Sequence, residues 1–218
     1  MANNFVDTFR HKGLRRKLVE ELKLKGITDE LVLNSIGLVP RHFFLDSSFL
    51  EYAYQDKAFP IGAGQTISQP YTVAYQSQLL KAQKGSKIME IGTGSGYQSC
   101  VLLEMGVKVY TIERQKLLYD KTRPLLESMG YTPKFFFGDG YKGLPSFAPF
   151  DGVIVTAGAP FIPEPLLQQL KIGAVLVIPV GDGANQIMTT VTRLSEKEFE
   201  KKELGACKFV PLLGDKAW

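Results

Sequence analysis

Cysteine, histidine and tryptophan are scarce in this chain of 218 residues, which holds two, two and one of them. Two cysteines, Cys100 and Cys207, are too few to indicate a disulfide framework, and no metal site is expected. The longest apolar run, residues 173–181, is far shorter than the roughly 20 residues that cross a bilayer, and no secretory signal precedes the first charges. We therefore expect a cytoplasmic protein that does not bind membranes.

A strong excess of either charge is also missing. Lysine and arginine number 26 against 22 aspartate and glutamate, a net charge of +4, which does not by itself indicate a nucleic-acid partner. Part of the excess lies in residues 10–17, "RHKGLRRK", interpreted as the solvated face of a helix. With 44% hydrophobic residues, the chain is long enough for one folded domain, expected to be a monomer.

The first third of the chain is predicted to be helical. Leu14, Leu18 and Leu22 recur at helical spacing, and Thr28 or Asp29 is the expected N-cap of a second helix that ends before Pro40. The next stretch is rich in aromatic residues, proline and glycine and is interpreted as ordered loop, and helical periodicity returns after it. The expected helices cover residues 28–40 and 71–83, and the loop between them covers residues 41–70.

Alternating strands and helices follow, and the strand segments are continuously apolar, as in parallel strands covered on both faces. The expected strands are 87–92, 107–113, 133–140, 150–158 and 173–181, separated by helices at 96–106, 114–130 and 163–170. This order predicts a doubly wound α/β sheet. Two further strands, 185–194 and 204–213, have no helix between them and are interpreted as an antiparallel pair at the sheet edge. The single domain 1–218 thus divides into 1–83, 84–181 and 182–218.

A glycine-rich turn, "MEIGTGSGYQ", lies where the first of these strands meets a helix. Ligands in such sheets bind outside the carboxyl ends of the strands. The spacing Gly92-x-Gly94-x-Gly96 lets a ligand approach the backbone closely. Tyr97 stands where the dinucleotide fingerprint needs a glycine or alanine, and the Walker pattern is absent, so neither a dehydrogenase nor a P-loop protein is favoured.

Acidic residues end the next two strands. Glu113 lies about twenty residues past the turn, where a carboxylate accepts hydrogen bonds from both ribose hydroxyls. Asp139 ends the third strand, where it can accept from an adenine amino group. Asp139 and Glu90 have structural alternatives, since Asp139 is a common turn residue and Glu90 can be a capping acid. The residues predicted to bind an adenosine cofactor are Glu90, Gly92, Thr93, Gly94, Gly96, Glu113, Asp139 and Gly140.

Five stretches together resemble the protein-L-isoaspartate O-methyltransferase family. They are "VPRHFF", "AFPIGAGQTISQP", "MEIGTGSGYQ", "FDGVIVTAGAPFIPEPLLQQLKIGAVLVIPVG" and "KFVPL". The resemblance runs from about Val39 to Leu213. It implies a Rossmann-like, mostly parallel seven-stranded sheet with an antiparallel last strand and extra N-terminal helices. It also implies S-adenosylmethionine as cofactor and methylation of the free α-carboxylate of L-isoaspartyl residues in damaged proteins and peptides, which starts repair through a succinimide.

By the same resemblance, Ser68 matches the active-site hydroxyl of the family, with Thr66 beside it. The segment 208–212 matches the part that helps to hold the substrate backbone, and Lys208 stands where many members have arginine. If that side chain only meets solvent, this change has no effect, whereas specificity shifts if it orients substrate. The residues expected to contact substrate are Gln65, Ile67, Val210, Pro211 and Leu212.

The loop "IGAGQTISQPY" carries no charge, and this fits the implied chemistry. A carboxylate acceptor is already ionised at neutral pH, so no general base is needed. His11 and His42, the two histidines, are accordingly expected to be structural or at the surface. The enzyme has to align oxygen, methyl and sulfur, and neutral donors such as the Ser68 hydroxyl can do this without lowering the nucleophilicity of the oxygen.

Two other functions fit the sequence less well. One is a methyltransferase of the same fold that acts on a small-molecule carboxylate or on RNA. The other is a non-catalytic module that binds the cofactor and a partner. The intact glycine-rich turn, Glu113, Asp139 and Ser68 argue against the second.

Overall fold

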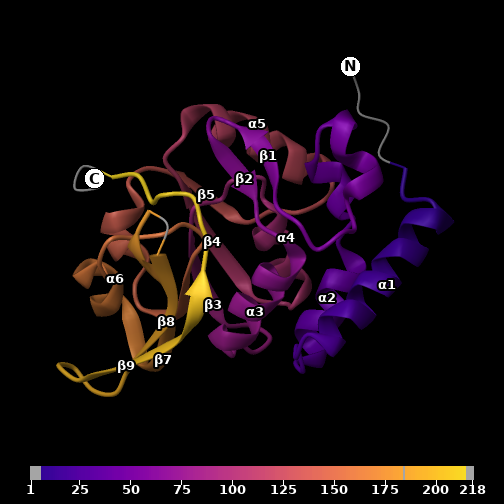
Figure 1. Ribbon diagram of the computed structural model, residues 1–218. Helices are drawn as coiled ribbons and strands as arrows, with labels where there is room; N and C mark the ends of the chain where they lie inside the picture. Colours follow the sequence, from indigo (N-terminus) through magenta and orange to yellow (C-terminus); the bar gives the residue numbers. More distant parts are fainter. Residues whose placement is uncertain (1–5, 184, 215–218) are drawn as a thin grey trace.

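The computed structural model describes residues 6–183 and 185–214 (Figure 1). Its centre is a seven-stranded sheet with the strand order β5-β4-β3-β6-β7-β8-β9. The strands are β3 (Lys87–Ile91), β4 (Lys108–Glu113), β5 (Lys134–Phe137), β6 (Phe150–Val155), β7 (Leu170–Asp182), β8 (Asn185–Arg193) and β9 (Phe199–Cys207). Strands β3 to β7 pair in parallel, and β8 is antiparallel to both neighbours. The predicted doubly wound, mostly parallel sheet is confirmed.

Helices cover both faces of this sheet. The helices α3 (Pro70–Leu80), α4 (Tyr97–Glu104) and α5 (Lys116–Ser128) pack on one face, and α6 (Glu164–Gln168) packs on the other with 3-10 turns at Gly140–Lys142 and Pro145–Phe147. Neighbouring side chains of a strand point to opposite faces. In β3, Ile88 belongs to the first core and Met89 to the second. This double burial explains the continuous apolar runs.

Two N-terminal helices pack outside α3 and α4, on the side of the molecule away from the C-terminal strands (Figure 1). Helix α1 (Phe9–Leu24) buries Leu18 and Leu22, as the helical spacing of the leucines predicts. Helix α2 (Glu30–Leu38) begins at Asp29, whose side chain accepts hydrogen bonds from two backbone N–H groups of the first turn. The predicted helices are therefore present, and Asp29 is the cap.

The stretch 41–70, interpreted as loop, contains more structure than expected. It forms two 3-10 helices, Arg41–Phe44 and Ser47–Tyr52, and a hairpin of β1 (Phe59–Gly62) and β2 (Gln65–Ile67). The hairpin turns through two residues of positive φ, Ala63 at 52° and Gly64 at 68°. Two such residues in sequence suit the twist of a tight hairpin. Most of this hairpin belongs to the charge-free stretch 61–71, and its second strand leads the chain into α3.

The prediction of a sheet strand over 204–213 is wrong beyond Cys207, where β9 ends. The buried side chain of Gln186 donates to the carbonyl of Phe209 (3.1 Å) and accepts from its N–H (2.8 Å). Pro211 also lacks an N–H for a sheet ladder. The chain instead runs beside Gly158, whose N–H and carbonyl bond to residues 210 and 212 at 2.8 and 2.7 Å. It therefore crosses toward the carboxyl ends of the strands.

Candidate active site

A cleft of about 760 Å³ opens at the carboxyl ends of β3 and β6. The connections leave in opposite directions on either side of these two neighbours, which makes this the switch point where such sheets bind ligands. Twelve of the fifteen predicted site residues line the cleft: Gln65, Thr66, Ile67, Ser68, Gly92, Thr93, Gly94, Glu113, Gly140, Val210, Pro211 and Leu212. Segments far apart in the sequence thus meet in one hollow.

Glycine is required in the turn after β3 for two different reasons. Gly92 has φ = +94°, and a Cβ there would lie 2.6 Å from the Thr156 hydroxyl oxygen. Gly96 has φ = +86°, and its Cβ would meet side chains of Thr122 and Leu126 at 2.9 Å. Gly92 therefore shapes the cleft. Gly96, which does not line it, lets α5 pack against the start of α4.

The Glu113 carboxylate stands at the end of β4 and is only 5% exposed. Its Oε2 accepts from the N–H of Gly94 (2.8 Å), and its Oε1 accepts from the N–H of Gln115 (2.7 Å). Each carboxylate oxygen has a second lone pair. Glu113 thus fixes the glycine-rich turn and still offers two acceptors to hydroxyl groups in the cleft.

Glu90 lies behind the turn rather than in the cleft lining. Its side chain is fully buried under α4, where the Ser99 hydroxyl donates to Oε2. Oε1 has no hydrogen-bond partner among the residues that the structure describes. Burial raises the pKa of Glu90 to about 7, and the nearby carboxylate of Glu113 adds to the rise.

Asp139 caps a turn in this structure. Its Oδ1 accepts from the N–H of Tyr141 (3.0 Å) at the start of the 3-10 turn Gly140–Lys142. The side chain lines a neighbouring hollow with Tyr141 and Phe161, whereas Gly140 lines the cleft itself. A Cβ at Gly140 would lie 2.3 Å from the side chain of Ile91, so only glycine fits there.

The acceptor side of the cleft is built by the loop between β2 and α3, Ser68 and Gln69, which we call the acceptor loop. A second hollow of about 310 Å³ shares Thr66, Ser68, Thr156 and Val210 with the main cleft. Within residues 6–183 and 185–214, no hydrogen bond engages the hydroxyl of Ser68 or of Thr66. Lys208 lines the second hollow only. Two ligands entering from the two hollows would meet at these shared residues.

Thr156 is the main residue that sequence reasoning missed. It follows β6, lines both hollows, and donates its hydroxyl to the carbonyls of Gly92 (2.5 Å) and Ile91 (3.0 Å). Its place at a strand end, in "TAGAP", is the signal that could have identified it. Further lining residues outside the prediction are Val73, Ile91, Ser95, Tyr97, Gln98, Ile112, Arg114, Gln115, Ala157 and Leu213.

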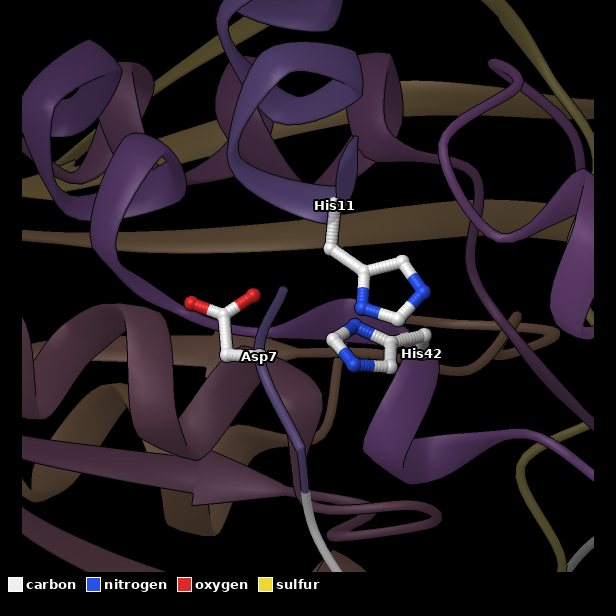
Figure 2. Close-up of side chains that lie close together, drawn as sticks. All are labelled: Asp7, His11 and His42. Atoms are coloured by element: carbon white, nitrogen blue, oxygen red, sulfur yellow. The ribbon is translucent and has the colours of Figure 1, made fainter. Parts of the chain in front are cut away.

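A separate polar cluster joins the N-terminal segment to the first 3-10 helix. Figure 2 shows Asp7, His11 and His42 close together, with the two imidazole rings tilted by 36° to each other, and their possible metal-ligand atoms lie within 4.8 Å of one another. The ring centroids are 3.8 Å apart. Arg15 donates to both carboxylate oxygens of Asp7 (3.1 and 2.9 Å), and Tyr54 contacts His42 Nδ1 at 2.6 Å.

These contacts describe a hydrogen-bonded structural cluster. Both ring nitrogens of His42 already have hydrogen-bond partners, the Tyr54 hydroxyl and the Val6 carbonyl, and the carboxylate of Asp7 is paired with Arg15. Burial and the neighbouring His11 lower the pKa of His42. As expected, neither histidine lines the cleft. Arg15 is only 5% exposed, so the interpretation of residues 10–17 as a solvated face is wrong for this residue.

Comparisons with known proteins agree with this architecture. A sequence profile of the protein-L-isoaspartate(D-aspartate) O-methyltransferase family matches residues 13–217. A protein-L-isoaspartate O-methyltransferase of Flavobacterium johnsoniae is 63% identical over 96% of this chain and 99% of the relative. One of Christiangramia forsetii is 62% identical with the same coverage.

Solved structures give the same result at lower identity. A protein-L-isoaspartate O-methyltransferase superposes with a TM-score of 0.85 and 27% identity, covering 93% of this chain and 67% of the other. A Plasmodium falciparum structure, described as a protein of this kind in complex with S-adenosyl-L-homocysteine, has a TM-score of 0.76 and 26% identity, covering 91% and 98%. None of the helices in the described part of the chain has the length and apolarity to cross a membrane.

Proposed function

Because the chain belongs to the protein-L-isoaspartate(D-aspartate) O-methyltransferase family, we propose that it methylates the free α-carboxylate of L-isoaspartyl residues in damaged proteins and peptides. S-adenosylmethionine is the methyl donor. The ester then collapses to a succinimide, which reopens partly to normal aspartate. The observation that carries this proposal is the pair of hollows that meet at Ser68, one walled by the glycine-rich turn and the other by the acceptor loop.

The residues of the main cleft fit this cofactor. Gly92 and Gly94 allow close approach to the backbone, and Glu113 keeps free lone pairs for the two ribose hydroxyls. The turn at Asp139 and Gly140 is assigned to the adenine. Glu90 supports the turn from behind. When bound, the cofactor supplies a methyl group on a positively charged sulfur.

The acceptor needs orientation rather than deprotonation. Its carboxylate is ionised at neutral pH, so attack on the methyl group requires no base. The hydroxyls of Ser68 and Thr66 are assigned as neutral donors that hold one carboxylate oxygen and leave the other free to attack. Charge is neutralised as carboxylate meets sulfonium, so a cation bound directly to the attacking oxygen would stabilise the ground state more than the transition state.

The peptide on either side of the isoaspartyl residue is assigned to the second hollow. Ser68 and Val210 line this hollow, whereas Gln65, Ile67, Pro211 and Leu212 line the adjoining main cleft. Lys208 at this hollow would influence which neighbouring side chains are accepted. We further propose that the protein is a cytoplasmic monomer without a nucleic-acid or membrane partner. Within this single domain, residues 1–83 would supply the N-terminal helices and the substrate-side loop, residues 84–181 the cofactor-binding core, and residues 182–218 the C-terminal antiparallel strands.

The test uses two synthetic peptides that differ only in having an isoaspartyl or an aspartyl linkage at one position. With labelled S-adenosylmethionine, we expect methyl transfer to the isoaspartyl peptide and none above background to its twin. Equal labelling of both peptides would contradict the proposal, as would labelling of RNA or of small carboxylates alone. Cofactor binding without transfer to any of these would instead favour the non-catalytic module.

A further inference from the structure

Arg41 is the largest fully buried side chain of the described residues, with 0% of its surface exposed. It begins the 3-10 helix Arg41–Phe44, in the "VPRHFF" stretch to which the site described above gives no role. Burial lowers the pKa of Arg41 to about 10, so the guanidinium is still charged at neutral pH. Arginine is almost never fully buried unless it is paired, which makes its partners informative.

Its partners are carbonyl oxygens rather than an acid. The guanidinium donates to the carbonyl of Ser68 (2.8 Å) and to the carbonyl of Lys57 (3.0 Å). It also lies over the ring of Tyr97, 4.9 Å from the centroid. Within the described residues, no carboxylate oxygen lies within 4 Å of it. One planar fork therefore holds the acceptor loop, the chain before β1 and the residue that follows the glycine-rich turn.

Stability alone does not explain such a residue. A buried charge without an ion pair is costly, and an apolar side chain of similar volume would fill the same space without that cost. The contacts that the charge makes possible are therefore the informative part. One is to the backbone of Ser68, which lines both hollows, and another is to Tyr97, which lines the main cleft.

We propose that Arg41 is a positioning residue that fixes the peptide unit between Ser68 and Gln69 relative to the cofactor turn. This inference rests on the function proposed above. With the Ser68 carbonyl held in the core, the backbone angles of this residue are fixed and its hydroxyl stays at the junction of the two hollows. Rotation of the peptide unit would move the hydroxyl, and a displacement of about 1 Å can cost a reaction roughly 100-fold.

The position of the charge also suits the reaction. Arg41 lines neither hollow, so it cannot clamp the attacking oxygen. Its field reaches the acceptor through the peptide that it binds, because a hydrogen-bonded carbonyl polarises the N–H of the same peptide unit. The loop thus remains free of charged side chains while a cation stands behind it.

Arg15 provides a matched control. It is a second buried arginine in the same part of the molecule, and it donates to a backbone carbonyl, that of Gly37, at 2.7 Å. Its other partners are Asp7 and Tyr54, and it lines neither hollow. Arg15→Lys should therefore perturb folding as Arg41→Lys does, without moving the acceptor loop.

The experiment compares Arg41→Lys, Arg41→Met and Arg15→Lys with the wild type on an isoaspartyl peptide. Lysine keeps the charge but cannot bind two carbonyls as a fork. We expect kcat to fall roughly 10-fold in Arg41→Lys and roughly 100-fold in Arg41→Met. The Kd for S-adenosylmethionine should change by less than about threefold, and kcat of Arg15→Lys should stay within about twofold of wild type. A loss of kcat in Arg41→Lys no greater than in Arg15→Lys would overturn the proposal.

Hydrogen exchange of the backbone N–H groups of residues 65–69 gives a readout that needs no turnover. Exchange should speed up in Arg41→Lys and stay unchanged in Arg15→Lys, because only the first releases the loop. Unchanged exchange in Arg41→Lys would refute the clamp. A wild-type protein that methylates no isoaspartyl peptide would instead refute the proposed function, and the exchange data would still decide whether Arg41 holds the loop. If Arg41→Met does not fold, Arg41→Lys carries the test.

Discussion

Replacing Glu90 by glutamine should change how stability depends on pH. The folded protein holds the proton of Glu90 up to a pKa of about 7, whereas the ordinary value is 4.5, because burial disfavours the carboxylate. Below pH 4.5 both the folded and the unfolded chain carry the proton. As pH rises toward 7, the unfolded chain loses it first, so the folded state loses stability until both are ionised.

The magnitude follows from the same values. At about 1.36 kcal/mol for each pH unit, the gap between 4.5 and about 7 corresponds to about 3 kcal/mol, of which about 2 to 3 kcal/mol should appear between pH 5 and pH 8.5. This is a large part of a typical free energy of unfolding of about 5–15 kcal/mol. Glu90→Gln keeps the shape of the side chain and cannot ionise, so this slope should vanish.

The assay is urea unfolding of both proteins from pH 5 to pH 8.5 without cofactor, since ligand binding would add its own stabilisation. The difference in unfolding free energy, variant minus wild type, should rise by about 2 to 3 kcal/mol across this range. Any constant cost of fitting the amide shifts this difference equally at every pH and therefore does not affect its rise. Glu51→Gln, at an exposed position, is the control and should give a flat difference. A flat difference for Glu90→Gln as well would show that burial does not raise the pKa of Glu90 in the folded protein.

Two further predictions concern the cleft. Ser68→Ala should lower kcat on an isoaspartyl peptide roughly 10- to 100-fold, because a hydrogen bond to a charged group is lost, while calorimetry should find the same affinity for S-adenosylmethionine; unchanged kinetics would remove the hydroxyl from the site. Glu113→Ala should weaken S-adenosylmethionine binding by at least roughly 10-fold, since ribose contacts and the support of Gly94 are lost together; an unaltered Kd in calorimetry would exclude Glu113 from the cofactor site.

The parts of the fold that depend on local pattern could be predicted from the sequence. Apolar runs gave the strands of the parallel sheet, and their ends located Glu113 and the glycine-rich turn, because parallel strands place their carboxyl ends along one edge. The acceptor loop was located by its resemblance to a known family rather than by its own pattern. Its hairpin was missed because two short strands leave little periodicity.

Features that depend on distant partners could not be predicted. Arg15 and Arg41 are buried because carbonyls and rings from other segments surround them, and nothing in the neighbouring sequence shows this. The course of residues 208–213 depends on the hydrogen bond between the side chain of Gln186 and the backbone of Phe209, which lies 23 residues further along the chain. The sequence predicts Asp139 as a cofactor contact, and in the structure it caps a 3-10 turn. An aspartate at a strand end suits both a turn and a ligand contact, so its residue type alone does not distinguish them.

In the proposed reaction the methyl group goes to the α-carboxylate of an isoaspartyl residue. Mass spectrometry of the peptide product tests it most directly, because fragmentation assigns the added methyl group to one residue. We expect a methyl ester at the isoaspartyl position that converts with time into a succinimide at the same position. A methyl group on any other residue, at a peptide terminus, or equally on the aspartyl twin would contradict it.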